Sequence, residues 1–216
     1  MEPDTSITVI RFMQDGGILM WPILLCSIIG MGISVERFVS LRRSSIDTRE
    51  FMDTMRQVLR QGSPQDAIET CERTNAPIAR VFRAGVLKHG RKKSDIREAI
   101  ENAGSMEIPR LERYLSALAT CANIAPLLGL LGTVQGMIMA FAQIQHKRGQ
   151  VSPADLAEGI STALYTTAFG LTVAIPLLVL YNYFTSRVED LVVEMEGSST
   201  ELLDLLTQDD DSDADA

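Results

Sequence analysis

The stretch YLSALATCANIAPLLGLLGTVQGMIMAFAQIQ, residues 114–145, contains no charged side chain and decides the fold class. A helix of about 20 predominantly apolar residues is long enough to cross the roughly 30 Å hydrocarbon core of a bilayer. Two further charge-free runs lie at 18–35 and 159–186. A soluble core helix rarely needs such a run, and this chain has three. The sequence therefore predicts an all-α membrane protein with three transmembrane helices.

Basic residues indicate the orientation of the spans. Arg37, Arg42 and Arg43 follow the first run closely, and Arg110 and Arg113 precede the second. Because basic span ends face the cytoplasm, we expect the N-terminus outside and both the large inner segment and the C-terminus inside. The expected divisions are an outer segment 1–15, spans 16–36, 114–145 and 159–186, a helical cytoplasmic domain 37–113, an outer loop 146–158, a cytoplasmic helix 187–208 and an acidic disordered tail 209–216.

The inner segment carries helix start and stop signals. Ser63 followed by Pro64 is typical of a helix N-terminus, with a hydroxyl N-cap and a proline at the first helical position. Gly90 marks the end of a helix that begins at Pro77. A further helix opens near Ser94 and is expected to run into the second span, bent at Pro109.

Charge and composition exclude several function classes. The formal net charge of −8 arises largely from the C-terminal stretch that ends in DDDSDADA, and no basic groove with interleaved aromatics exists, so a nucleic-acid partner is not expected. Three cysteines and two histidines stand isolated, which argues against a disulfide framework, a metal site or another cofactor site. The chain has no acid–base pair or nucleophile constellation, and we expect no enzyme activity.

Small residues recur at helical spacing in the second and third runs. They are Ala125, Gly129, Gly132, Gly136 and Ala140 in the second, and Gly159, Ala163, Thr167, Gly170 and Ala174 in the third. Such stripes let helix backbones approach closely in lipid, so they predict packing interfaces. They also favour assembly of several copies into a ring. The glycine-rich GLLGTVQG lacks the Lys-Ser/Thr pair of a phosphate loop.

Hydroxyl groups lie beside these stripes. Thr133 is in the second run, and Thr162, Thr166 and Thr167 cluster at the start of the third. A threonine in a membrane helix can bond to the carbonyl four residues earlier, which is a purely structural role. Alternatively, the cluster lines a narrow polar path, where hydroxyls hold water or position a titrating partner but carry no proton themselves. The residues alone leave both readings open.

Two motifs, APLLGLLGTVQGMIMAF at 125–141 and LAEGISTALYTTAFGLTVAIPLLVLYNYF at 156–184, resemble the MotA/TolQ/ExbB proton channel family, and most closely its ExbB and TolQ branches. The stretch PRLERYLSALATCANIAPLLG at 109–129 fits as well. The resemblance implies an ion channel-forming subunit in a bacterial cytoplasmic (inner) membrane, driven by the proton motive force. It places the pore threonines of the family on Thr133 and Thr167.

The same resemblance implies partners. It predicts a homo-oligomer, expected to be a pentamer, around an ExbD- or TolR-like single-span protein that supplies an intramembrane Asp. For the ExbB branch it implies service to TonB-dependent transport across the outer membrane, together with a TonB-like protein. A TolQ-like role in envelope maintenance, a motility motor and a non-conducting membrane scaffold are the alternatives.

One position departs from the family pattern. Relatives commonly read GIxEALxxTAxGL, whereas this chain reads GISTALYTTAFGL, with Thr162 in place of the glutamate. Glu158 lies at the mouth of the span and is not its equivalent. A buried carboxylate costs about 2.5–3.5 kcal/mol on insertion scales, so its replacement eases insertion. The three charge-free runs then hold no carboxylate, and proton flow depends on the partner's Asp. Na⁺, which threonine oxygens can coordinate, is the alternative ion.

Overall fold

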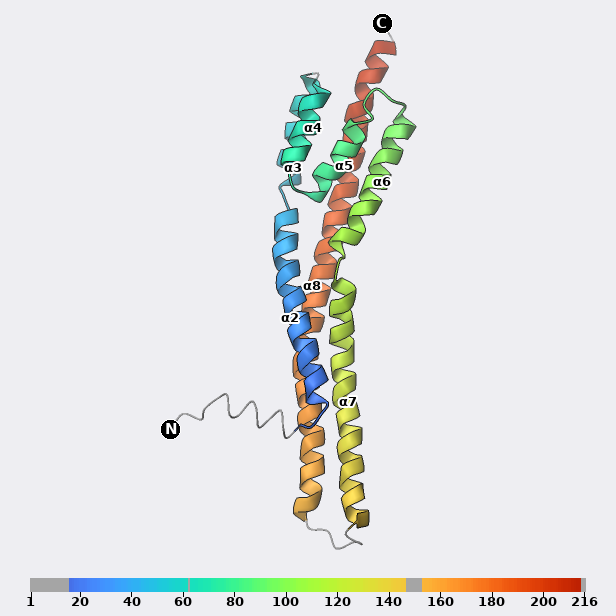
Figure 1. Cartoon of the computed structure of the whole chain (residues 1–216). Helices are drawn as coiled ribbons and strands as arrows, with labels where there is room; N and C mark the ends of the chain where they lie inside the picture. The colour runs from blue at the N-terminus through green and yellow to red at the C-terminus, as the bar shows by residue number, and fades with distance from the viewer. Residues whose placement is uncertain (1–15, 62, 147–152, 215–216) are drawn as a thin grey trace, which may run out of the picture. The chain divides into compact units, whose positions relative to one another are not determined.

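A computed structural model describes residues 16–61, 63–146 and 153–214. In the last of these ranges, side chains are described only for residues 156–207. This part of the chain contains seven helices and no strand (Figure 1). They are α2 (Met20–Ser44), α3 (Thr48–Arg60), α4 (Pro64–Arg73), α5 (Pro77–Val86), α6 (Lys93–Leu111), α7 (Leu115–His146) and α8 (Pro153–Ala214).

The helices form two compact units. The first contains the described part of Met1–Glu36 together with Tyr114–Tyr183, so it holds most of α2, all of α7 and the beginning of α8. The second contains Arg37–Arg113 and the described part of Phe184–Ala216, which adds α3 to α6 and the remainder of α8.

Three helical stretches are long and apolar enough to cross a membrane. They are Met20–Arg60, Lys93–His146 and Leu156–Thr207, with mean hydropathies of 1.7, 1.8 and 1.9 over their most apolar windows. Only 22–28% of each window is buried within the protein, and side chains such as Leu127, Ile138 and Val179 are more than half exposed. Exposed apolar surface on this scale is favourable against lipid tails and unfavourable against water. The structure confirms the predicted all-α membrane fold with three apolar spans.

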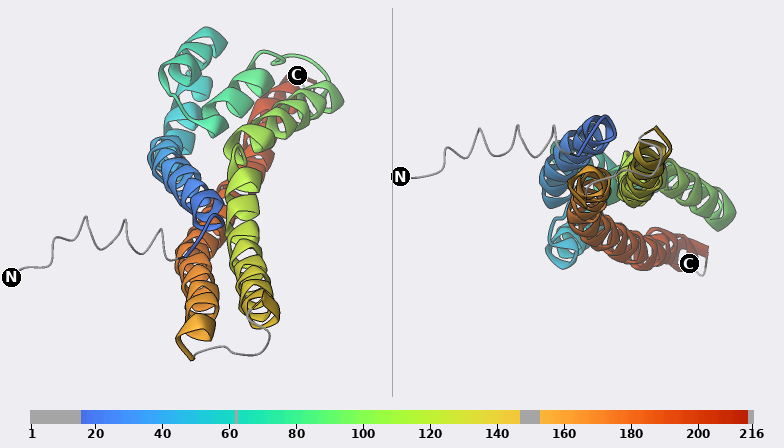
Figure 2. Two further views of the ribbon diagram at one scale, coloured as in Figure 1. Left: turned by 60° about the horizontal axis from the view of Figure 1, so that its bottom comes forward. Right: turned by 90° about the horizontal axis from the view of Figure 1, so that it is seen from below.

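In the first unit, α8 packs against both α7 and α2, and Figure 2 shows the three helices from two further directions. Gly30 of α2 lies so close to α8 that a Cβ on it would fall 2.6 Å from a methyl group of Leu177. Ile23 and Met20 of the same helix are fully buried. The first span is therefore held to the third by close helix contact.

The second unit has an apolar core of its own. Phe51 of α3 and Phe82 of α5 contact each other with ring centroids 5.5 Å apart. Gly85 lets α6 and α8 approach α5 closely, since a Cβ on this residue would lie 2.9 Å from Ile100 of α6 and 3.3 Å from Leu202 of α8. The helix start predicted at Ser63 and Pro64 is present: α4 begins at Pro64, and the Ser63 hydroxyl accepts a hydrogen bond from the Asp66 amide.

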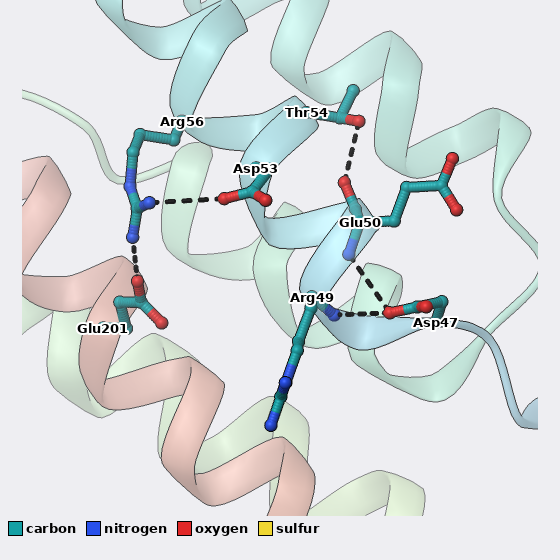
Figure 3. A network of polar contacts seen from close by, with 7 residues as sticks. All are labelled: Asp47, Arg49, Glu50, Asp53, Thr54, Arg56 and Glu201. Carbon is teal, nitrogen blue, oxygen red and sulfur yellow. Dashed lines mark hydrogen bonds and ion pairs between the residues drawn. The ribbon is translucent and has the colours of Figure 1, made fainter.

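Ion pairs link the helices of this unit to α8. Figure 3 shows Arg56 of α3 between Asp53 of the same helix and Glu201 of α8. Lys93 of α6 contacts Asp204 of α8 at 3.2 Å. All these side chains are partly exposed, so each pair is worth at most about 1 kcal/mol.

One carboxylate of the second unit is buried. Glu107 of α6 is 3% exposed and accepts hydrogen bonds from Arg80 of α5 at 2.6 Å and from Arg110 at 2.5 Å. Arg37, also 3% exposed, donates to the carbonyl oxygen of Leu111 at 3.2 Å and so satisfies a carbonyl at the end of α6.

The expected continuous helix through Pro109 differs from the structure. Pro109 lies inside α6, which ends at Leu111, and α7 begins at Leu115. Tyr114, between them, has a φ of 64°. This left-handed backbone conformation interrupts a right-handed helix. The sequence placed the change of direction at the proline, whereas the chain leaves the helix a few residues later.

The membrane boundaries predicted from the sequence stay predictions. The outer segment 1–15, residues 147–152 of the loop and the last two residues of the tail lie outside the described residues.

Candidate functional site

Glycines bring the backbones of α7 and α8 into direct contact. A Cβ built on Gly136 of α7 would lie 2.5 Å from the carbonyl oxygen of Gly159, and one on Gly170 of α8 would lie 2.7 Å from the carbonyl oxygen of Ala125. Real Cβ atoms do not approach backbone atoms this closely. The two helices can pack in this way only because these positions carry no side chain.

The predicted packing residues all lie at this contact. Gly129, Gly132 and Gly136 of α7 and Ala163 and Gly170 of α8 are buried, and they face one another within a single chain. The two stripes therefore occupy each other. These positions are therefore not free to form the contacts between copies that the ring prediction drew on.

Thr167 crosses the same contact with a hydrogen bond. Its hydroxyl donates to the carbonyl oxygen of Gly129 at 3.0 Å, and the side chain is half-buried. The Gly129 carbonyl is reachable because Gly129 presents no side chain toward α8. Thr167 therefore takes part in the helix–helix contact while one side of it stays exposed, which places it at the polar edge of the contact.

Thr166 is fully buried. Its hydroxyl lies 2.7 Å from the carbonyl oxygen of Gly16, which precedes α2, and 2.8 Å from that of Thr162. A hydroxyl has one hydrogen, so the two carbonyls share it. Its methyl group fills the space above Gly132, where a Cβ would fall 2.5 Å away.

The other two predicted threonines lie at different places. Thr133 is half-buried and donates to the carbonyl oxygen of Leu130 in its own helix at 2.6 Å. Thr162 is half-buried, and its methyl group lies 3.5 Å from the Cβ position of Gly17. The structure thus gathers Thr162 and Thr166 at the start of α2 and Thr167 at α7. Whether any of the four faces a pore stays a prediction.

Sequence reasoning missed the residues just before α2. Gly16 and Gly17 contact Thr166 and Thr162, which are about 150 positions away along the chain. No periodicity or motif connects two such segments, because the contact depends on how α2 enters its place beside α8. The only local signal is the pair of glycines itself, and Gly17 has a φ of 75° that favours glycine.

Among the described residues, no group of three or more histidine, cysteine, aspartate or glutamate side chains is placed to hold a metal ion. The polar groups of the contact are hydroxyls and backbone carbonyls. Such groups can bind water or a small cation and can orient a titrating carboxyl, but they cannot supply one.

Comparison with known proteins gives a consistent result. Residues 73–197 match the model of the MotA/TolQ/ExbB proton channel family. This region contains all of α6 and α7 and the glycine and threonine positions of the α7–α8 contact.

Individual relatives cover most of the chain. An ExbB homologue of Methanothermobacter thermautotrophicus, named as a biopolymer transport protein, is 30% identical over 88% of this chain and 67% of its own length. The biopolymer transport protein exbB1 of Vibrio cholerae is 30% identical over 77% of this chain and 74% of its own. The Tol-Pal system protein TolQ of Pseudomonas aeruginosa is 34% identical over 53% and 54%.

A solved structure shows the same fold. The structure of Campylobacter jejuni MotAB matches with a TM-score of 0.64, covering 86% of this chain and 75% of the matched chain at 15% identity.

Proposed function

Since the chain belongs to the MotA/TolQ/ExbB proton channel family, we propose that it is the channel-forming subunit of an ExbB–ExbD type motor in a bacterial inner membrane. In this role it conducts protons down the membrane gradient and energises TonB-dependent transport across the outer membrane. It is a multi-pass membrane protein, with the N-terminus outside and the C-terminus inside in our proposal.

The observation that carries the proposal is the polar edge of the α7–α8 contact. Thr167 and Thr133, which we propose as pore residues from the resemblance, lie on two tightly packed helices whose charge-free runs, 114–145 and 159–186, hold hydroxyls but no carboxylate. Hydroxyls cannot bind and release protons at ordinary pH. The subunit therefore needs a partner that brings a titrating group, and we propose an ExbD- or TolR-like single-span protein with an intramembrane Asp.

The energy of ion flow suffices for such a motor. One charge crossing about 100 mV releases about 2.3 kcal/mol, so a few steps can move the partner against its contacts with the subunit. A ring of copies, expected to be five, would let each copy present the same threonines to the enclosed partner. Because the glycine stripes are used within each chain, the ring contacts must come from other faces.

A TolQ-like role is the second candidate. The similarity to the Tol-Pal protein TolQ, at 34% identity, favours it directly. Which process the motor energises, TonB-dependent transport, envelope maintenance or motility, depends on the partner's outer domain. In all three roles the subunit performs no covalent chemistry and needs no cofactor.

Reconstitution with the partner tests the proposal. The chain is purified together with a single-span partner encoded beside it and placed in vesicles with a membrane potential and an internal pH dye. We expect proton flux only when both proteins are present, and none when the partner's Asp is changed to Asn. Flux of Na⁺ in place of protons would reassign the ion. An assembled complex without flux of either ion would identify a scaffold.

A further inference from the structure

A cavity of about 390 Å³ lies inside the second unit, between α5, α6 and the part of α8 near Ser199. Gly104 of α6 helps to open it, because a Cβ on this residue would meet no atom within 4 Å. The walls are mainly aliphatic and thioether side chains, namely Val81, Ile100, Ile108, Val192, Met195 and Leu203. Ligand sites in proteins usually have such apolar walls and volumes of about 300–1,000 Å³.

A hydroxyl without a protein partner lies in the wall of this cavity. Ser199 is 9% exposed as a residue and forms no hydrogen bond with any of the residues that the structure describes. Its oxygen is not among the fully buried polar atoms, so it stays open to the cavity and can bond to a molecule there. The neighbouring helix side chains show the usual alternative, since Thr200 donates to the carbonyl oxygen of Glu196. Ser199 is therefore the polar group that a bound molecule would engage.

The charges at the cavity bias it against anions. Arg97 contributes one positive charge, while Glu101 and Glu196 contribute two negative ones, and all three side chains are exposed. The net negative charge near the entrance repels a carboxylate or phosphate and favours a neutral or cationic group.

We propose that this cavity binds a small amphiphile that is neutral or cationic, with its apolar body against the walls and a hydrogen-bonding group at the Ser199 hydroxyl. The site lies in the second unit and shares no residue with the α7–α8 contact. The assignment is therefore independent of the proposed ion-conducting function.

Three indole compounds with one apolar body and different charges test the site. Full-length protein in detergent is titrated with tryptamine, indole and indole-3-acetate, and binding is followed by saturation-transfer NMR with protein-free micelles as the blank. We expect saturable binding of tryptamine and indole. Binding of indole-3-acetate should be at least about tenfold weaker, because the entrance charges repel its carboxylate.

Variants locate the binding. Gly104→Leu places a side chain in the cavity and should abolish saturable binding of tryptamine while the protein still melts cooperatively. Ser199→Ala should weaken it about fivefold, the effect of one net hydrogen bond. Gly197→Ala is the matched control, because Gly197 lies outside the cavity wall and a Cβ there meets no atom within 4 Å.

Two outcomes overturn the assignment. One is the lack of saturable binding of tryptamine and indole to the folded wild-type protein. This outcome overturns the assignment even if the reason is that a second copy of the chain covers the cavity. The other is undiminished binding to a folded Gly104→Leu variant.

Discussion

The hydroxyl of Thr167 on α8 donates a hydrogen bond to the carbonyl oxygen of Gly129 on α7, 3.0 Å away. The bond joins the two spans within their glycine contact, where a Cβ on Gly129 would lie 3.1 Å from the Cα of Thr167. It gives Thr167 a measurable structural role beside the conducting role that we propose. The two roles differ in the size of the effect that each predicts for removal of the hydroxyl.

Thr167→Val removes the hydroxyl and keeps the size and β-branching of the side chain. Loss of one hydrogen bond between membrane helices should lower the free energy of unfolding by only about 0.6 kcal/mol. Partner-dependent ion flux should nevertheless be lost, because the hydroxyl positions water or the partner's carboxyl. Melting in detergent and flux in vesicles measure the two effects separately. Thr167→Ser keeps the hydroxyl and should conduct; normal flux through Thr167→Val would remove the residue from the ion path.

Glycines at the α7–α8 contact should be intolerant even of a methyl group. A Cβ on Gly136 would lie 2.5 Å from the carbonyl oxygen of Gly159, and a backbone atom cannot turn aside as a flexible side chain can. We expect Gly136→Ala to destabilise by about 1–3 kcal/mol, as overpacking does. Gly32→Ala is the matched control, since a Cβ on this glycine of α2 meets no atom within 4 Å. Equal melting temperatures for the two variants would contradict the contact.

The spans and their small-residue faces could be predicted from the sequence, because both depend on local spacing. Charge-free runs report the length of a membrane crossing, and Gly129, Gly132 and Gly136 fall on one helix face by periodicity alone. The partner of that face could not be predicted. Stripes that suit a neighbouring copy suit another helix of the same chain equally well, and the structure pairs them within the chain.

Contacts between distant segments were also beyond the sequence. The bond between Thr166 and Gly16 joins residues with no shared pattern, and the exposure of Ser199 to a cavity depends on how far α6 and α8 stand apart. Such features depend on tertiary packing, so neither spacing nor composition can reveal them.

Removing the buried carboxylate of the second unit should be costly. Glu107 is 3% exposed and accepts hydrogen bonds from Arg80 and Arg110. Both arginine side chains are at least 40% exposed, so water can partly satisfy them after the change, and we expect Glu107→Gln to cost about 1–3 kcal/mol. Glu72→Gln breaks the exposed pair with Arg83 and should cost less than about 1 kcal/mol. Chemical denaturation of both variants gives the comparison, and similar losses would show that burial adds nothing.

Ionisation of the Cys71 thiol should lower the stability of the protein at alkaline pH. Burial raises the pKa of its thiol from 9.0 to about 12, so the folded protein holds this proton more tightly than the unfolded chain does. The resulting stability is fully present below pH 9 and is lost as the pH rises from 9 toward 12. Melting of the wild type should fall more steeply over that range than melting of Cys71→Ala, after correction for their difference at pH 7. Parallel pH profiles would show that the thiol ionises freely in the folded state.

Thr166 should matter for holding the chain before α2 in place. Its side chain is fully buried, and its hydroxyl is shared between the carbonyl oxygens of Gly16 and Thr162. Thr166→Val keeps the methyl group against Gly132 but leaves the Gly16 carbonyl without its donor, which should cost about 1–3 kcal/mol. Thr172→Val is the control, because Thr172 is exposed and bonds only to the Ala168 carbonyl of its own helix. We expect melting to fall for Thr166→Val alone. Hydrogen exchange should also rise at Met20 and Trp21, whose amides bond to the carbonyls of Gly17 and Ile18 at the start of α2. If exchange there is unchanged while melting falls, the hydroxyl stabilises the packing of α8 and does not tether the residues before α2.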